Sequence, residues 1–321
     1  MSLDTLLPTL NDPEHSPSAK ELTSLSGLGG DDRERFLDVW RSLSIQRRRD
    51  VVDMLGQITE DNVEFDFSAV FMAGLFDTDV QVRAESIKAL WEYEDDDLVP
   101  ILLRMLHDTE AIVRAEAALG LGRFLMRAEL TDREDTLSLQ VEEELRTSLH
   151  DENELVEVRG RALEAVGVRG KEWVHDVIEE AYATADRRFM ISAIHAMGRN
   201  ADLEWMPTVI EEMGSDDSEM RFEAATAAGG LADEEAIPHL AELTGDEDTE
   251  VQEAAIAALG LIGGPSARSV LHSVASESSD DRVLEAVRDA LAEADFVEDP
   301  LGFKVHLDDS VADDASEDDD E

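Results

Sequence analysis

A period of about 31 residues runs through most of this chain and constrains its fold more than any other feature. The clearest copies are DTDVQVRAESIKALW, which starts at Asp77, and DTEAIVRAEAALGLG, which starts at Asp108. Taking the residue after the central Val, or its equivalent, as an anchor gives the series Arg83, Arg114, Arg159, Met190, Arg221, Gln252 and Leu284. Residues eight places later keep the same register: Trp91, Gly122, Gly167, Gly198, Gly229, Gly260 and Ala292. Two landmarks that recur together predict an array of similar units rather than a conventional globular domain.

Each unit contains two helical segments. In one copy, the apolar residues from Val251 to Leu259 follow helical spacing. Asp246 and Asp248 precede them and are expected to cap the first turn. Gly260 is expected to end this helix, because glycine tolerates the left-handed conformation just past a helix C-terminus. The preceding segment, AIPHLAELTG, has its apolar residues on one stripe of a second helix. Neither helix can bury its apolar face alone, so the units must stack on one another.

We therefore predict an all-α fold, a right-handed α-α superhelix of about seven to eight helical hairpins over residues 31–296. Successive anchors lie 31, 45, 31, 31, 31 and 32 residues apart, and the one long spacing predicts a helical insertion at about residues 127–140. Residues 1–30 follow the period less closely and are expected to be weakly ordered. Residues 297–321 end in DDSVADDASEDDDE, a run that predicts an acidic disordered tail.

The composition limits the partners that this chain can have. It carries 77 acidic and 27 basic residues, a formal charge of -50, which repels nucleic acids and anionic membranes and favours a basic protein partner. Adaptation to salt, or solubility alone, explains the same charge without any partner. There is no Cys, so disulfides and thiolate sites are excluded. No segment has the pattern of a secretion signal or the apolar length of a membrane span, so we expect a cytoplasmic protein.

The strings VRAEAALGLG and VQEAAIAALG resemble HEAT repeats, in particular the short HEAT-like class found in phycobilisome lyase-type proteins. The resemblance covers about residues 45–294 and implies an α-α solenoid. For function it implies several classes: scaffolds, adaptors, bilin lyase subunits and a few metal enzymes. One such enzyme, deoxyhypusine hydroxylase, has a di-iron site that uses His-Glu dipeptides. No His in this chain is followed by Glu, so that activity is disfavoured.

Other motifs that could carry chemistry have a simpler structural explanation. His107, His150 and His175 each precede an Asp, but at the first two positions the Asp is expected to cap the next helix. The acidic strings at Asp77 and Asp246 lack the Gly and the Glu that complete a calcium-binding loop. We therefore predict no catalytic residue, no metal site and no cofactor.

Two further groups of side chains are open to more than one interpretation. Trp91, Trp173 and Trp205 fall near the turns inside their repeats, where they could stack on a bilin or an aromatic peptide. We expect instead that they staple adjacent repeats. The basic run Arg47–Arg49 could hold an anion or the acidic tail, although a solvated helix face is the commoner explanation.

A recurrent set of glutamates is the best predictor of a binding surface. They stand on the second helices of successive repeats, with the central three at intervals of 31: Glu179, Glu180, Glu211, Glu212 and Glu242. In HEAT-like solenoids the helices of this kind generally line the concave face, so the resemblance implies an acidic groove for a Lys/Arg-rich segment. The alternative is a solvated face. We predict a non-enzymatic HEAT-repeat scaffold or adaptor. A bilin lyase-like or lyase-assisting protein and a salt-adapted protein with no single partner are the alternatives.

Overall fold

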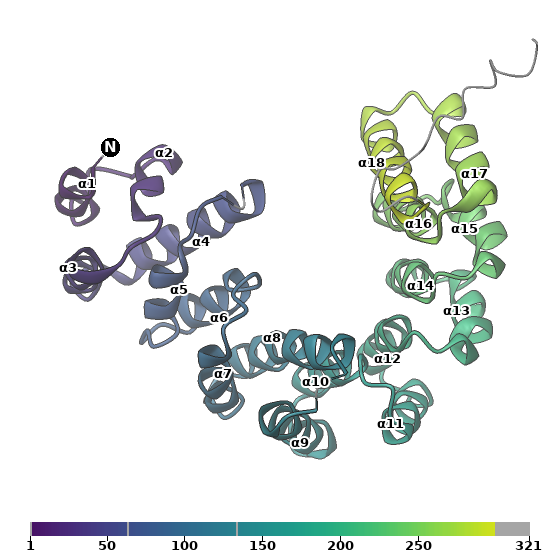
Figure 1. Ribbon diagram of the computed structural model, residues 1–321, viewed down its shortest axis with the longest axis horizontal. Helices are drawn as coiled ribbons and strands as arrows, with labels where there is room; N and C mark the ends of the chain where they lie inside the picture. The colour runs from purple at the N-terminus through teal and green to yellow at the C-terminus, as the bar shows by residue number, and fades with distance from the viewer. Residues whose placement is uncertain (1, 63, 133, 299–321) are drawn as a thin grey trace, which may run out of the picture. The chain divides into compact units, whose positions relative to one another are not determined.

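The structure, a computed structural model, describes residues 2–62, 64–132 and 134–298. It divides into two compact units, Met1–Ala201 and Asp202–Glu321, which are described separately. The helices of the first unit are α1 (Leu3–Leu10), α2 (Ala19–Leu22), η1 (Thr23–Leu25), α3 (Gly30–Trp40), α4 (Ile45–Asp61), α5 (Ser68–Gly74), α6 (Val80–Ala89), η2 (Asp96–Leu98), α7 (Val99–Met105), α8 (Ala111–Leu130), α9 (Thr136–His150), α10 (Val156–Val166), α11 (Glu172–Tyr182) and α12 (Arg187–Asn200). Those of the second are η3 (Leu203–Trp205), α13 (Met206–Met213), α14 (Ser218–Leu231), η4 (Glu234–Ala236), α15 (Ile237–Leu243), α16 (Thr249–Ile262), α17 (Gly264–Glu277) and α18 (Asp281–Glu298) (Figure 1).

These elements confirm the predicted all-α class, since the described residues contain helices and no strand. Within each unit the helices stack as an α-α solenoid. None of the described helices combines the length and the apolar character needed to cross a membrane.

The N-terminal residues form packed helices. α1, α2 and η1 bury five leucines, each at most 6% exposed: Leu6, Leu7, Leu10, Leu22 and Leu25. α1 contacts α3, and α2 contacts α4. The sequence predicts weak order for residues 1–30, whereas the structure has ordered elements there. The physical reason is that apolar residues three or four places apart give even a short helix a stripe that a neighbour can bury.

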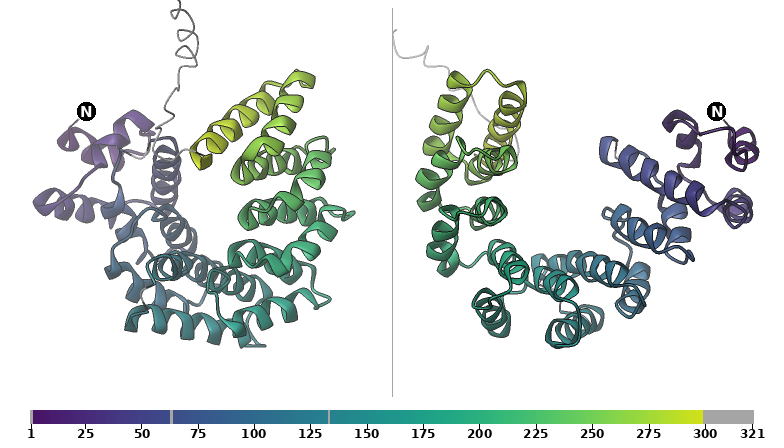
Figure 2. Two further views of the ribbon diagram at one scale, coloured as in Figure 1. Left: turned by 45° about the vertical axis from the view of Figure 1, so that its right-hand side comes forward. Right: turned by 180° about the vertical axis from the view of Figure 1, so that it is seen from behind.

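The hairpins are framed differently from the sequence prediction. Each second helix of the predicted repeat packs most closely on the helix that follows it, which gives the pairs α5/α6, α7/α8, α9/α10 and α11/α12 in the first unit. The second helices are called short here and the helices that follow them long, although α9 is longer than α10. The long helices also pack on one another in the order α4, α6, α8, α10 and α12. This unit therefore has two layers. Figure 1 shows α6, α8, α10 and α12 on the inner side of its bend and α7, α9 and α11 on the outer side, and the view from behind in Figure 2 agrees.

Glycines set the close spacing of the long helices. A Cβ added to Gly122 on α8 would lie 2.9 Å from Cα of Ala165 on α10. In the second unit, a Cβ on Gly260 would lie 2.8 Å from Cα of Ala290 on α18. Gly260 lies inside α16, so its predicted role as a helix terminator is wrong. The positive φ that ends α16 is at Gly263, with φ 66°. Glycine recurs in this register because a side chain there would collide with the next long helix.

Residues 127–140, predicted as a helical insertion, lengthen two helices rather than adding one. α8 has 20 residues and α9 has 15, and they contact each other. Arg169, only 3% exposed, links α8, α9 and the loop between them. Its guanidinium donates to Glu129 at 2.7 Å, to Glu134 at 2.9 Å and to Glu142 at 3.1 Å. A buried cation needs such partners, and the insertion carries two of the three carboxylates, those of Glu129 and Glu134.

The second unit repeats the same arrangement. Its hairpins are α13/α14, α15/α16 and α17/α18, the long helices α14, α16 and α18 pack in sequence, and α13, α15 and α17 form the other layer. Asp248 caps α16 as predicted, since its carboxylate accepts the backbone N–H of Glu250 at 3.0 Å. α18 continues to Glu298, and the rest of the predicted tail, residues 299–321, lies outside the described residues.

Candidate functional site

The anchor arginines have a structural role. Arg83 on α6 donates to the backbone oxygen of Asp77 ahead of its own helix at 3.0 Å, and to both carboxylate oxygens of Asp108 in the next connection. Arg221 on α14 does the same through a backbone oxygen ahead of its helix and both carboxylate oxygens of Asp246. Each arginine thus joins the loop before its helix to the loop of the next copy. The residues that give the repeat its register therefore stabilise the stack.

The basic run Arg47–Arg49 is also used within the first unit. Arg47 donates to two backbone oxygens of the N-terminal segment, at 3.0 and 2.6 Å. Arg48 donates to the carboxylate of Asp77 at 3.1 Å, and Arg49 donates to both oxygens of Asp79 at 2.8 and 2.6 Å. The hydrogen bonds from Arg49 lower the pKa of Asp79 to about 2. The run therefore holds the capping loop of α6, and each of its guanidinium groups already has an acceptor.

The five glutamates predicted to form a binding surface lie on three short helices. α11 in the first unit carries Glu179 and Glu180, and in the second unit α13 carries Glu211 and Glu212 and α15 carries Glu242. Glu212 is half-buried, and the other four are exposed. The carboxylates of these four form no hydrogen bond or ion pair with the described residues. Because α13 packs beside α15 and the two helices bury equivalent positions, Glu211 and Glu242 lie on one face of the second unit.

The place of α11 does not fit the prediction that Glu179 and Glu180 line a concave groove. In the first unit the inner side belongs to the long helices, and α11 with Glu179 and Glu180 lies in the outer layer (Figure 1). The reason is helix spacing. Long helices that meet through small residues such as Gly122 and Ala165 approach closely, and the more closely spaced layer becomes the inner side of a curved stack. Glu179 and Glu180 are therefore exposed residues on a helix of the outer layer.

The three tryptophans have different environments. Trp205 is 6% exposed, which agrees with the expected staple. Trp173 is half-buried, and the guanidinium carbon of Arg146 lies 4.8 Å from its ring centroid. Trp91, just after α6, is 53% exposed. The burial of Trp205 fits a packing role, whereas the exposed ring of Trp91 does not.

Trp91 lines a groove between α4 and α6 with a volume of about 450 Å³. The groove is lined from α4 by Asp53 and Glu60, and from α6 by Glu85 and Lys88. Its volume lies in the lower part of the range of small-ligand sites, about 300–1,000 Å³. The groove is thus a second candidate surface, on long helices rather than on the short helices that carry the predicted glutamates.

This groove was not predicted, although the sequence holds a signal for it. Trp91 stands eight residues after an anchor, where Gly122 and Gly260 stand in other copies. A side chain in that register meets the next long helix, as the close approach at Gly122 shows. Accordingly α6 ends at Ala89, and Trp91 follows it in a turn. The replacement of Gly by Trp at this position of the repeat is a sequence signal from which a groove near Trp91 could have been predicted.

A group of charged side chains lies on the inner layer of the first unit. Burial raises the pKa of Glu116 on α8, and the nearby charges of Arg161 and Lys88 oppose that shift. Glu164 on α10, 5% exposed, accepts hydrogen bonds from Arg161 and from the hydroxyl of Ser192, both at 2.7 Å. The bond to Ser192 ties α10 to α12, so Glu164 stabilises the layer.

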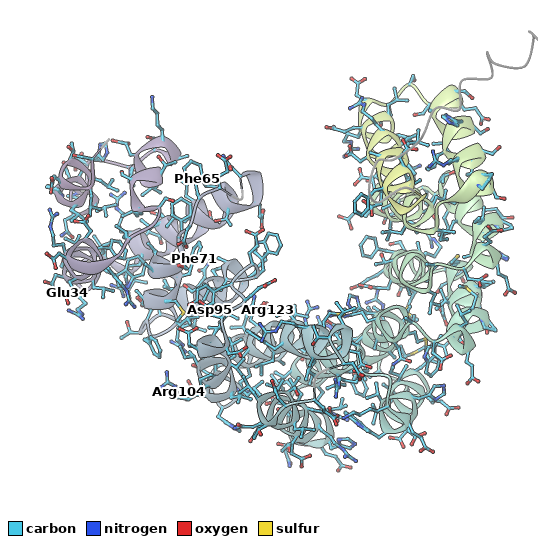
Figure 3. The ribbon with its side chains drawn as sticks, in the orientation of Figure 1. Glu34, Phe65, Phe71, Asp95, Arg104 and Arg123 are labelled. Atoms are coloured by element: carbon cyan, nitrogen blue, oxygen red, sulfur yellow. The ribbon has the colours of Figure 1, made fainter. Side chains whose placement is uncertain are left out.

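Arg123, also on α8, makes a similar link. It donates to the backbone oxygen of Leu90 at the end of α6, and burial lowers its pKa to about 10. Figure 3 places Arg123 on the inner side of the first unit, whereas Arg104 on α7 lies on the outer side. Arg123 thus helps to fix the turn that presents Trp91.

The His-Asp pairs at His107 and His150 lie where one helix ends and the turn to the next begins, whereas His175 and Asp176 lie inside α11. The carboxylates of Asp108 and Asp151 each accept the backbone N–H two residues later, at 2.9 Å in both cases. Nδ1 of His150 lies 2.7 Å from the backbone oxygen of Arg146, one turn earlier on α9. Nε2 of His107 lies 3.7 Å from a carboxylate oxygen of Glu144. The two aspartates shape the turns before α8 and α10, although not as the predicted side-chain caps of the first helical turn.

A family profile described as HEAT repeats matches residues 68–139 and 206–292. The chain contains HEAT repeats. The matches include helices of both units, and they confirm the resemblance seen in the repeated strings. A comparison with curated protein sequences found no match.

Solved structures show where this HEAT-repeat chain stands in fold. The complex of CpcE and CpcF of phycocyanin lyase from Nostoc sp. PCC7120 is similar over 87% of this chain and 97% of that chain, with 16% identity and a TM-score of 0.54. Human deoxyhypusine hydroxylase in complex with glycerol matches over 91% and 96%, with 21% identity and a TM-score of 0.36. Yeast importin-beta (Kap95p) matches over 91% and 46%, with 12% identity and a TM-score of 0.47. At these identities the likeness to the lyase complex shows the fold alone.

Proposed function

We propose that this HEAT-repeat chain is a non-enzymatic scaffold or adaptor that binds a protein with a basic segment through its exposed acidic surface. One observation carries the proposal. Anchor arginines form ion pairs within the solenoid, as Arg221 does with Asp246. In contrast, Glu211 and Glu242 are exposed and unpaired among the described residues.

The geometry of the second unit supports this reading. α13 and α15 are neighbours, and each contributes one carboxylate from the same register of its helix. Two neighbouring carboxylates do not stabilise each other, and together they make the local potential more negative for an approaching lysine or arginine. A basic segment that crossed both helices would neutralise the pair. Such a contact favours fast association and depends strongly on salt.

Glu179 and Glu180 on α11 offer a comparable pair in the first unit. Their exposure supports the same chemistry, but on a separate unit. The two pairs are therefore best tested separately, with a double substitution in each unit.

The bilin lyase-like alternative has the weaker physical support. A bilin carries propionate groups, and the groove at Trp91 presents three carboxylates, from Asp53, Glu60 and Glu85. These charges oppose an anionic chromophore. When the protein is added to a free bilin, the visible absorbance spectrum of the bilin is expected to stay unchanged. A saturable change in that spectrum would favour the lyase interpretation.

Capture from cell lysate tests the scaffold proposal. Immobilised protein is incubated with lysate at low and at high salt, and bound proteins are identified by mass spectrometry. The wild type is expected to retain proteins with basic segments at low salt and to release them at high salt. The Glu211→Lys/Glu242→Lys variant is expected to lose them, because it reverses the surface potential of the second unit.

A matched control separates this surface from bulk charge. Glu14→Lys/Glu34→Lys makes the same change in net charge at exposed positions of the N-terminal segment, with Glu34 on α3 (Figure 3). The control is expected to retain the captured proteins. Equal loss from both variants, or no loss from either, would contradict docking on α13 and α15.

A further inference from the structure

The groove between α4 and α6 combines an exposed aromatic ring with three carboxylates, two of which have no partner among the described residues. Trp91 is 53% exposed, although indole rings of this size are usually largely buried. The carboxylates of Glu60 and Glu85 form no hydrogen bond or ion pair with the described residues, and Asp53 accepts one hydrogen bond, from Gln57 at 3.3 Å. A ring and several acids that converge on one groove are the elements of a cation site.

The fold explains why Trp91 is presented in this way. Its register belongs to the close contact between long helices, where glycine stands in five other copies: Gly122, Gly167, Gly198, Gly229 and Gly260. At Gly122, Gly167, Gly229 and Gly260 an added Cβ would lie 3.0 Å or less from the next helix. An indole cannot occupy that contact, so α6 ends at Ala89 and the ring projects over the groove. The packing of the solenoid therefore does not require this ring where it stands.

The walls of the groove suit a long side chain with a charged end. Val52 and Ala89 contribute apolar surface, and the acids stand on both helices. The formal charge of the titratable lining groups is -2, from Asp53, Glu60 and Glu85 against Lys88. Arginine and lysine place an apolar stem along such a surface and keep the charge near acids and over an aromatic face.

We propose that this groove binds an arginine side chain from an extended basic segment of a partner protein. The guanidinium stacks on the indole of Trp91 and pairs with Glu85 and Glu60, which lie on opposite walls. Arginine fits better than lysine because its planar group both stacks and forms paired hydrogen bonds. The inference rests on the proposed function, since it names the chemistry by which a basic partner is recognised in the first unit.

The test uses the whole protein with indole ¹⁵N labelling. Its four tryptophans, Trp40, Trp91, Trp173 and Trp205, give four indole signals, and the Trp91→Phe variant identifies the one that matters. The probe is the peptide acetyl-Gly-Arg-Leu-Arg-Gly-amide, and its control carries citrulline in place of both arginines. The arginine peptide is expected to shift the Trp91 signal saturably and to leave the Trp205 signal in place. The citrulline peptide is neutral and nearly equal in shape, and its affinity is expected to be lower by about tenfold or more.

Substitutions locate the recognition chemistry. Trp91→Ala and Glu60→Gln/Glu85→Gln are each expected to weaken binding of a fluorescent arginine peptide by about tenfold, measured by anisotropy. Glu34→Gln, an exposed acid on α3, is the control and is expected to have no effect. Equal shifts with the arginine and citrulline peptides, or affinity unchanged by both groove variants, would overturn the proposal.

The two binding proposals can fail separately. The Glu211→Lys/Glu242→Lys variant is expected to lose lysate partners and still to show the shift of the Trp91 signal, because its changes lie in the second unit. A Trp91 shift with no lysate capture would leave the groove established and remove the surface on α13 and α15. Lysate capture without a shift of the Trp91 signal would support the surface on α13 and α15 and overturn the groove proposal.

Discussion

Arg83 on α6 holds the carboxylate of Asp108, 25 residues later, through two parallel hydrogen bonds: Nη2 to Oδ1 at 2.8 Å and Nε to Oδ2 at 3.0 Å. Arg221 and Asp246 form the same bond pattern at the same separation, at 2.8 and 2.7 Å. The side chains of both pairs are at most 16% exposed. A two-point contact of this kind fixes the distance and the rotation between successive repeats.

The pair in the second unit is expected to matter for stability. Asp246→Ala leaves Arg221 without its carboxylate and should lower the free energy of unfolding by about 3 kcal/mol, measured by urea denaturation. Asp295→Ala removes the partner of Arg268 from a pair in which Asp295 is 60% exposed, and should cost much less. Similar losses from the two substitutions would show that the repeated arginine contact has no special role.

Gly260 is expected to resist substitution although it lies inside a helix. Alanine there gains helix propensity of about 1 kcal/mol, but its Cβ would lie 2.8 Å from Cα of Ala290, and relieving that overlap costs about 1–3 kcal/mol. We expect Gly260→Ala to lower the melting temperature. Gly56→Ala on α4 is the control, because nothing lies within 4 Å of the added Cβ, and it should raise the melting temperature. The opposite signs would not appear if glycine served only as a helix terminator.

Much of the fold was predictable because the repeat signal is strong, and the errors have physical causes. The spacing of the anchors predicted stacked helix pairs, and α6, α8, α10, α14 and α16 all contain the predicted apolar stripe. Sequence spacing shows which segments are helical, but not which neighbour each helix packs on most closely. That choice depends on contacts such as Gly122 with Ala165, and it reversed the expected layers in the first unit.

The candidate sites were predictable to different degrees. The exposure of Glu211 and Glu242 follows from the polar side of an amphipathic helix, so periodicity could indicate it. The groove at Trp91 depends on the end of α6 at Ala89, two residues before the landmark, and on the face that α4 turns toward the groove. Both features depend on how helices pack against each other, and the 31-residue period of the sequence does not predict that packing.

Asp79 is expected to give a pH-dependent contribution to stability. Its pKa is lowered from 3.8 to about 2, first by the hydrogen bonds from Arg49, so its folded state favours the ionised form. The stabilisation is therefore fully present above about pH 4 and is lost as the pH falls toward 2. The difference in free energy of unfolding between wild type and Asp79→Asn should shrink over that window. A difference that stays constant from pH 6 to pH 2 would contradict this account.

Glu116 is expected to behave in the opposite way. Burial raises its pKa above the ordinary 4.5, so the ionised carboxylate costs stability at neutral pH, and protonation removes that cost. Glu116→Gln should therefore increase the free energy of unfolding at pH 7, and the gain should disappear as the pH falls below about 4.5. A loss of stability at pH 7 would instead show that attraction to Arg161 and Lys88 outweighs burial.

The affinity for a lysine-rich peptide, measured over a salt series, is the most direct test of an acidic docking surface. The wild type and the Glu14→Lys/Glu34→Lys control should bind alike, with affinity falling roughly tenfold between about 50 and 500 mM salt. Glu211→Lys/Glu242→Lys should bind more weakly at low salt and show a flatter salt dependence. Coincident curves for all three proteins would contradict the claim that the exposed glutamates of α13 and α15 recognise a basic partner.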